Sequence, residues 1–256
     1  MYIEGSWQYK YQLKHDSPPS KFGYKDIIPL WTAEKWAPQP LIRRHKKAGA
    51  KYFVALRCHH DNIACWNSKN HRWNSVNFGP KKDIVGLWRR AALQEGLRFG
   101  VTEHIAYSWN WFNVNKGADR TGPYAGVPYD GNDSRNQDFY QEAHDEKVPH
   151  YPVHLSEVFK QRQFDRVSDL VAQHEPDLLV TDGGVPFGKY GIRLGQFLQP
   201  EHGTARREAA VYNIMNQKDP VRYGDFRGGI AVEDIERSVV NGIPYEPWQC
   251  DTCVGD

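Results

Sequence analysis

The sequence predicts an α/β fold built on a parallel β-sheet. Three short apolar runs, at 51–57, 96–101 and 177–180, have the length of buried strands, and each follows an amphipathic stretch with helical spacing. Helices and strands that alternate with the same polarity form right-handed βα units. Polar side chains follow each run directly, and the carboxyl edge of a parallel sheet is where active sites lie.

The expected elements follow one another in a regular order. They are a loop at 1–32, a helix within 33–48, a strand at 51–57, a loop at 60–80, a helix at 81–95, a strand at 96–101, a long loop at 106–155, a helix at 156–175, and strands at 177–180 and 209–214. Pro38 and Pro40 are expected to interrupt the first helix, and Ser156 to cap the third. Four strands are too few for a closed eight-stranded barrel, so the sheet is either open or continues outside this chain.

Composition narrows the classes of partner. The 256 residues suffice for one large α/β domain, and the 33 Lys and Arg nearly balance the 31 Asp and Glu, which argues against a general basic field for nucleic acid. No apolar run approaches membrane-spanning length, and the first residues do not resemble a signal peptide. The nine Trp and 14 Tyr are more than a core needs, and aromatic platforms with polar edges suit sugar rings.

The four cysteines allow a zinc site on paper. Cys58 and Cys65 flank the histidine pair, and Cys250 and Cys253 form a CxxC half-site. Structural zinc usually uses two tight Cys knuckles, whereas the spacing between Cys58 and Cys65 is wide and adjoins a predicted strand. We therefore expect buried or partly buried thiols.

Asp182 is the sharpest candidate for chemistry. It ends an apolar strand and precedes Gly183 and Gly184, which let the backbone turn and let a ligand approach closely. A carboxylate in this position could serve as a nucleophile or a base. The local pattern is equally compatible with an Asp that caps the next turn through its own backbone.

His59 and His60, followed by Asp61, form the second candidate. Imidazoles suit hydroxyl recognition, and they also bind metals or move protons. Adjacent residues of a strand point to opposite sides, so only one His can face a given pocket unless the strand has already ended. The alternative is a pair of satisfied core histidines, but the nearby loop with Trp66 and Trp73 favours a site.

Several segments also form an ordered series of motifs. They are Ala33–Pro38, Lys46–Tyr52, His59–Asn62, Trp66–Lys69, Trp73-Asn74, Gly79–Asp83, Phe99–Val101 and Pro176–Gly183. The series covers nearly the whole chain, and it resembles the α-L-fucosidase family of retaining glycoside hydrolases. The combination is far more specific than any single motif.

The resemblance implies roles for particular residues. Asp182 falls on the family's nucleophile, His59 and His60 fall on its fucose-hydroxyl ligands, and Trp66 is expected to help wall the sugar site. The substrate would be a fucosylated oligosaccharide or glycan, with no nucleic acid or membrane partner. Neither a metal nor an organic cofactor is expected.

The acid/base glutamate is less well defined. In the family it precedes a Pro-Trp element, and Glu233 and Glu236 both precede Pro247-Trp248 here. We favour Glu236, although a helix through this segment would keep both glutamates near one face. Glu103 and His104, which stand where the family usually has Tyr after Phe-Gly-Val, are expected to bind substrate, and Glu103 is the next candidate for the acid.

The resemblance further implies a (β/α)8-type barrel, incomplete at both termini. Residues 1–256 are expected to form a single catalytic domain that lacks its first strand and its C-terminal end, because the family's early His-Trp-Gly element does not precede Met1. Val180 also replaces the family's common Trp two residues before the nucleophile, which indicates a divergent branch. Secretion or a periplasmic location would follow from the family alone.

Two other functions remain compatible with the same residues. One is a sugar-binding protein that keeps the aromatic pocket but has lost turnover. The other is a metal-dependent hydrolase built on His59, His60 and Asp182. Hydrolysis that persists in a chelator would separate fucosidase activity from the second alternative.

Overall fold

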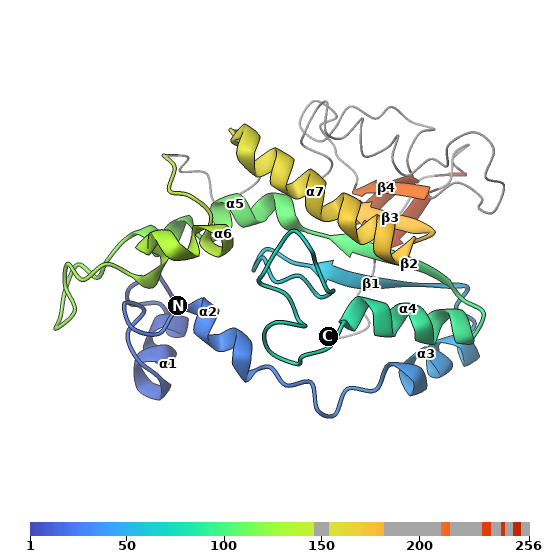
Figure 1. Ribbon diagram of the computed structural model, residues 1–256, viewed down its shortest axis with the longest axis horizontal. Helices are drawn as coiled ribbons and strands as arrows, with labels where there is room; N and C mark the ends of the chain where they lie inside the picture. The colour runs from blue at the N-terminus through green and yellow to red at the C-terminus, as the bar shows by residue number, and fades with distance from the viewer. Residues whose placement is uncertain (146–153, 182–210, 216–231, 237–241, 244–247, 252–256) are drawn as a thin grey trace.

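The protein is built around one parallel sheet (Figure 1). The computed structural model describes residues 1–145, 154–181, 211–215, 232–236, 242–243 and 248–251. Its strands are β1 (Tyr52–Cys58), β2 (Arg98–Glu103), β3 (Leu178–Thr181), β4 (Val211–Met215), β5 (Val232–Glu236) and β6 (Trp248–Asp251). They lie side by side in chain order, and every neighbouring pair is parallel. The predicted α/β class with a parallel sheet is confirmed.

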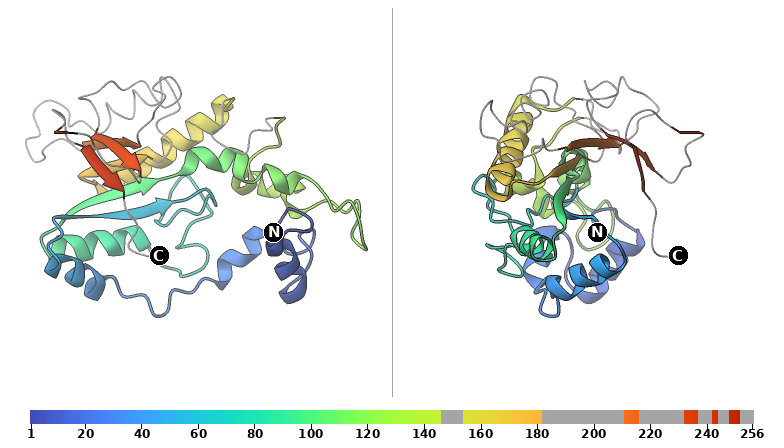
Figure 2. Two further views of the ribbon diagram at one scale, coloured as in Figure 1. Left: turned by 180° about the vertical axis from the view of Figure 1, so that it is seen from behind. Right: turned by 90° about the vertical axis from the view of Figure 1, so that its right-hand side faces the viewer.

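Two of the longer helices, α4 and α7, lie along the convex side of the strands (Figure 2). In the right-hand view of Figure 2 the strands follow an arc, and α4 and α7 lie outside it. The α-helices are α1 (Trp7–His15), α2 (Tyr24–Ile27), α3 (Pro38–Lys47), α4 (Ile84–Gln94), α5 (Ser108–Trp111), α6 (Gln137–Tyr140) and α7 (Glu157–His174). Short 3-10 turns occur at Ile28–Leu30, Ile105–Tyr107, Asn113–Lys116, Asp130–Asn132 and Ser134–Asn136. No helix in these described segments is both long and apolar enough to cross a bilayer.

The three predicted helices are present, and two of them begin at a side-chain cap. Pro38 is the first residue of α3 and Pro40 the third, so neither interrupts it, because the first turn of a helix needs no N–H donors at these positions. The Asp83 carboxylate accepts from the Gly86 N–H at 2.9 Å and starts α4. The Ser156 hydroxyl accepts from the Phe159 N–H at 3.1 Å and starts α7, as expected.

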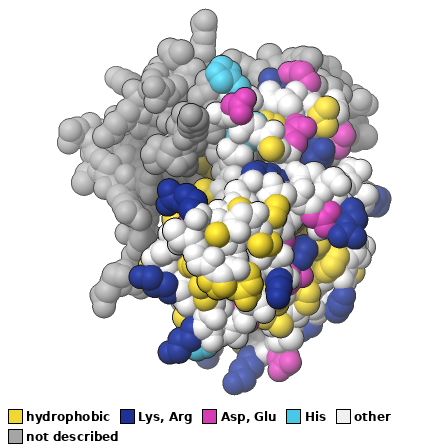
Figure 3. Space-filling view, turned by 90° about the vertical axis from the view of Figure 1, so that its left-hand side faces the viewer, with side chains coloured by type: hydrophobic (Ala, Val, Ile, Leu, Met, Phe, Trp, Pro, Cys, Tyr) yellow, Lys and Arg dark blue, Asp and Glu magenta, His cyan; other side chains and the backbone are white. Residues whose placement is uncertain are grey.

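The prediction that residues 1–32 form a loop is wrong. Ser6 caps α1 by accepting from the Tyr9 N–H at 3.2 Å. Tyr9 is buried and donates its hydroxyl to Asp119 at 2.7 Å, whereas Trp7 and Tyr11 are 73 % and 58 % exposed. A helix held by a polar tertiary contact, with aromatic residues outside, lacks the apolar stripe that predicts helices. Figure 3 shows apolar side chains interspersed with Lys and Arg on this side of the molecule.

Two strands were not expected. β5 carries acidic residues within its five positions, and β6 is four residues long, so neither has a clear apolar run. The assignment of β5 as a strand also corrects the helical argument about the two glutamates. Residues three apart share a face only on a helix, so the helical argument does not apply to Glu233 and Glu236 in a strand.

The core joins the first three strands to the helices outside them. Val101 of β2 and Leu179 of β3 are fully buried with Val85 of α4 and Leu170 of α7. Gly100 of β2 lies between two strands, and a Cβ there would come within 3.0 Å of side chains on both. This close packing fixes the register in which Cys58, Glu103 and Thr181, the last residues of β1, β2 and β3, are aligned.

Candidate active site

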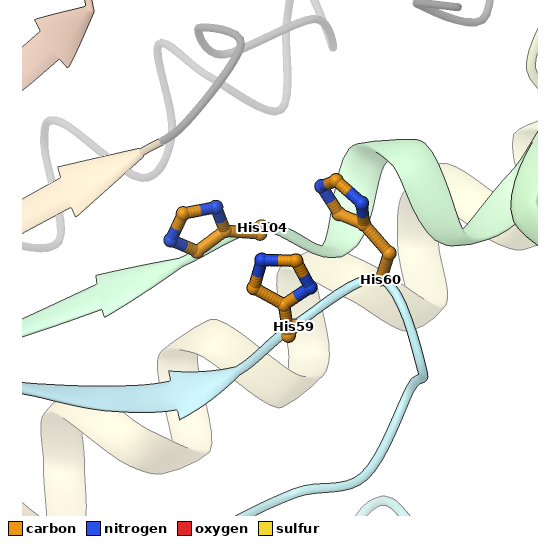
Figure 4. Close-up of side chains that lie close together, drawn as sticks. All are labelled: His59, His60 and His104. Atoms are coloured by element: carbon orange, nitrogen blue, oxygen red, sulfur yellow. The ribbon is translucent and has the colours of Figure 1, made fainter. Parts of the chain in front are cut away.

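Three histidines meet at the carboxyl edge of the sheet. His59 and His60 follow β1, His104 follows β2, and Figure 4 shows their rings gathered just beyond the strand ends. The ring centroid of His59 lies 4.1 Å from that of His60 and 4.6 Å from that of His104. Among the described residues these three form the one group of His, Cys, Asp or Glu that could hold a metal ion, with ligand atoms all within 4.8 Å of one another.

Both members of the histidine pair can face the same space because β1 has already ended. The strand stops at Cys58, and its carbonyl accepts from the His104 N–H at 3.1 Å. His59 and His60 therefore lie in a turn, where the alternation of a strand no longer applies. The predicted pair is brought together with the predicted His104, while His59 is exposed and the other two rings are half-buried.

Two aromatic residues border this cluster that the sequence did not single out. The ring of Tyr107 lies 4.8 Å from that of His60, and the ring of Trp111 lies 5.2 Å from it. Trp111 is 51 % exposed. The run of aromatic residues directly after β2 was the available signal, and it was hidden within the long loop expected at 106–155.

A buried asparagine holds the turn that carries the histidine pair. Asn62 is fully buried and has a positive φ of 66°, a conformation that Asn tolerates better than most residues. Its amide nitrogen donates to the Phe139 carbonyl at 2.7 Å, and its amide oxygen accepts from Arg166 of α7 at 2.5 Å. Its own carbonyl accepts from the His71 ring at 2.9 Å. Helix α7 and residue 139 thus fix the turn from two sides.

Asp61 is turned toward the amino-terminal segment. Its carboxylate accepts from the Tyr24 hydroxyl at 3.2 Å and from the Ile63 N–H at 3.3 Å. Burial raises the pKa of Asp61, because the charged form loses solvation, while these hydrogen bonds oppose the shift. Asp61 therefore stabilises the turn through Tyr24 and the Ile63 N–H.

The structure places Glu103 and Trp66 in the core. Glu103 forms a buried ion pair with Arg57 at 3.1 Å and accepts from the Ile105 N–H at 3.1 Å. Trp66 is fully buried, lies under the Arg57 guanidinium at 5.1 Å, and donates its indole N–H to Asp169 at 3.2 Å. These contacts do not bring either side chain into the histidine cluster, so their contact with substrate stays a prediction.

The predicted carboxylates are less fully described. Asp182 lies outside the described residues; its predecessor, Thr181, ends β3 opposite Glu103. Glu236 is the last residue of β5 and pairs with Asp251, and Glu233 pairs with Trp248. The role of Glu236 as the acid stays a prediction.

Cys58 is a buried thiol and Cys65 a partly buried one, as expected. Cys58 and Cys65 are both free, and burial raises the pKa of Cys58 to about 11. The Cys58 sulfur accepts from Arg166 at 3.5 Å. Cys250 lies in β6, and Cys253 is outside the described residues. Neither Cys58 nor Cys65 joins the described group of possible metal ligands.

Comparisons with known proteins identify the family. A human tissue α-L-fucosidase is 32% identical over 111 residues, which are 43% of this chain and 23% of that protein. An α-L-fucosidase of Dictyostelium discoideum is 29% identical over 171 residues, 64% of this chain and 29% of its own length. The chain thus spans between a fifth and a third of the length of these curated relatives.

Solved structures give the same result over more of the chain. One α-L-fucosidase structure matches 97% of this chain and 48% of its own, with a TM-score of 0.63 and 25% identity. A Thermotoga maritima α-fucosidase in complex with fucose shares the fold, with a TM-score of 0.60, 24% identity and the same coverage. The sequence model of the family described as alpha-L-fucosidase matches residues 1–256, and the chain therefore belongs to the α-L-fucosidase family.

Proposed function

We propose that this protein hydrolyses terminal α-L-fucosides by a retaining double displacement. The observation that carries the proposal is the convergence of His59, His60 and His104 at the carboxyl edge, one strand away from the residue that precedes Asp182. Membership of the α-L-fucosidase family supports the same reaction. The substrate would be a fucosylated oligosaccharide or glycan.

The described part of the site suits the recognition of a sugar. Each imidazole offers one nitrogen donor and one acceptor when neutral, which matches a hydroxyl group that both gives and takes a hydrogen bond. Trp111 and Tyr107 add aromatic surface beside His60, against which the apolar C–H face of a sugar can pack. Polar contacts would select the hydroxyl pattern, and aromatic contacts would add affinity.

Asp182 is proposed to attack the anomeric carbon while a glutamic acid protonates the leaving oxygen. In retaining enzymes the two carboxyl groups are about 5 to 5.5 Å apart. The acid must be neutral before the attack, which an apolar wall or the nearby Asp182 charge would achieve by raising its pKa. Water then displaces Asp182, with the same glutamate acting as base.

Glu236 is the preferred acid. It ends β5, so its backbone lies at the carboxyl edge, as do the residues before His59 and His104. Glu233 is the second residue of β5, three positions before that edge. Removal of the acid should slow a natural sugar leaving group strongly and an activated aryl leaving group little. The split is expected for Glu236→Ala and not for Glu233→Ala.

The fold proposed for the whole catalytic unit is a (β/α)8 barrel. Six consecutive parallel strands in chain order, curved with helices outside, are the arrangement of such a barrel. Residues 1–256 are proposed to belong to a single catalytic domain. The active site of a barrel lies at the carboxyl ends of its strands, the edge at which the three histidines lie.

An aryl α-L-fucoside tests the function. We expect the wild-type protein to release the aryl group with or without EDTA, because the proposed reaction uses no metal. Asp182→Gly should abolish release, and added azide should restore part of it by replacing the missing nucleophile. Asp145→Gly, at an exposed position, is the control and should keep the wild-type rate.

Three outcomes would contradict the proposal. A sugar-binding protein without turnover would bind fucose and release no aryl group. A metal-dependent hydrolase would lose activity in EDTA. Wild-type rates in Asp182→Gly would remove Asp182 from the mechanism.

A further inference from the structure

The histidine cluster has a property that sugar recognition does not require. Each of His59, His60 and His104 presents one ring nitrogen to a common space, and the three nitrogens lie within 4.8 Å of one another. Figure 4 shows that the rings come from two adjacent strand ends rather than from one flexible segment. Three convergent imidazoles form one of the commonest ligand sets for transition metals in proteins.

The distances are close to those of a bound ion. Zinc takes imidazole nitrogens at about 2.0 to 2.1 Å in tetrahedral geometry, which places two such nitrogens roughly 3.3 Å apart. The ring nitrogens, which lie within 4.8 Å of one another, therefore need to approach each other by about 1.5 Å at most to bind one ion. His59 is exposed and can turn about its side-chain bonds to supply this movement.

The backbone positions are already fixed. The hydrogen bond from the His104 N–H to the Cys58 carbonyl, at 3.1 Å, ties the two strand ends together. Asn62 fixes the turn after His60 through Arg166 and the Phe139 carbonyl. Only side-chain rotation is then needed, which keeps the entropic cost of forming a metal site low.

The chemistry of the donors selects the ion. Imidazole nitrogens suit zinc, copper and nickel, whereas calcium and magnesium require oxygen ligands. The nearest carboxylate on β2, that of Glu103, is held by Arg57 at 3.1 Å and so is not a ligand in this arrangement. The remaining coordination positions would be filled by water.

The geometry points to a binding site for one divalent first-row transition-metal ion on His59, His60 and His104, with zinc as the probe. The ion excludes the sugar, because the same ring nitrogens would hold the fucose hydroxyls. Zinc is therefore an inhibitor that competes with substrate. The metal site rests on the cluster geometry alone, and only the competition rests on the proposed function.

Calorimetric titration of the full-length, EDTA-stripped protein with zinc chloride tests the site. We expect one equivalent of zinc to bind and magnesium chloride to give no heat of binding. His104→Phe keeps a stacked ring and removes the nitrogens, so it should weaken zinc binding by about 100-fold or more. His15→Phe changes a histidine of α1 whose ring centroid lies 4.3 Å from that of Tyr11, and this variant should bind zinc as the wild type does.

A second variant covers a folding defect in His104→Phe. His59→Ala changes the exposed member of the cluster, and its far-UV circular dichroism and melting temperature should match the wild type, with the same loss of zinc affinity. Saturating L-fucose should lower the apparent zinc affinity of the wild type. Zinc binding that is absent, or that survives in both cluster variants, overturns the site, and zinc binding unaffected by fucose overturns the competition.

The two proposals can fail separately. Turnover of the aryl fucoside is measured in EDTA, where the metal site plays no part. Zinc binding without turnover would leave the metal site standing and remove the fucosidase assignment. Turnover without zinc binding would leave the fucosidase assignment standing and remove the metal site.

Discussion

Replacing Asn62 tests how the histidine turn is held. Asn62→Ala removes the acceptor of the buried Arg166 guanidinium, which costs about 1.5 to 3 kcal/mol, and the donor to the Phe139 carbonyl, which costs about 1 kcal/mol. It also places Ala at a φ of 66°, which costs roughly 1 kcal/mol more than Asn. We expect a loss of about 3.5 to 5 kcal/mol in the free energy of unfolding.

Asn62→Gly separates the side-chain contacts from the backbone. Glycine adopts a positive φ without strain, so this variant should lose the hydrogen bonds and be about 1 kcal/mol less destabilised than Asn62→Ala. Asn70→Ala is the matched control, because the exposed Asn70 amide donates to the Asp165 carbonyl at 3.0 Å. Asn70→Ala should change the free energy of unfolding by less than about 0.5 kcal/mol.

Urea unfolding followed by circular dichroism measures these differences, and turnover of the aryl fucoside measures their effect on the site. Both Asn62 variants should lose more activity than Asn70→Ala, since the turn carries His59 and His60. A loss in Asn62→Ala no larger than that of Asn70→Ala would refute the claim that this network holds the turn. Equal losses in the Ala and Gly variants would refute the backbone part of the estimate.

Three further results are expected. Burial, with the Arg166 charge as a smaller cause, lowers the pKa of His71 well below its usual value, so the stability that neutral His71 contributes is complete above a pH of about 6.5 and decreases as the pH falls below it. Urea unfolding at pH 7.5 and 5.5 should therefore show that His71→Gln loses less unfolding free energy on acidification than the wild type, whereas the exposed control His45→Gln loses as much as the wild type. Equal losses in His71→Gln and the wild type would contradict this. Glu103→Ala leaves the Arg57 guanidinium buried without its carboxylate and should lower the free energy of unfolding by about 3 to 5 kcal/mol. Glu103→Gln keeps a hydrogen-bond acceptor for Arg57 and should lower it less. Equal losses in the two variants would show that the contact between residue 103 and Arg57 does not stabilise the fold. Cys58, with its pKa raised to about 11, should resist iodoacetamide at pH 7.5 in the native protein and react in urea, and peptide mapping that finds native modification would contradict its burial.

The sequence predicted elements whose signals are local. The helix at α7 combines a Ser cap with an apolar stripe, and β1 to β3 are continuous apolar runs, so periodicity and capping sufficed. Helix α1 and strand β5 were not predicted because α1 has no apolar stripe, β5 has no apolar run, and their conformations depend on partners elsewhere. Tertiary context overrides local pattern in such segments.

The same division applies to the candidate site. His59, His60 and His104 stand at strand ends, and the polarity of parallel strands predicts that such residues meet. The support of the turn by Arg166, 104 residues away from Asn62, has no local signature. The burial of Trp66 beneath Arg57 likewise depends on how the loop folds back on β1, which no motif encodes.

Trapping the covalent intermediate tests the central claim most directly. A 2-fluoro-α-L-fucoside with a good leaving group should react with the wild-type protein once and then hydrolyse slowly, because the fluorine destabilises the positive charge that develops at the anomeric carbon in each transition state. Mass spectrometry of the digested protein is expected to find one fluorofucosyl group on the peptide that contains Asp182. A label on another carboxylate, or an unlabelled protein that continues to turn over aryl α-L-fucosides, would contradict the account.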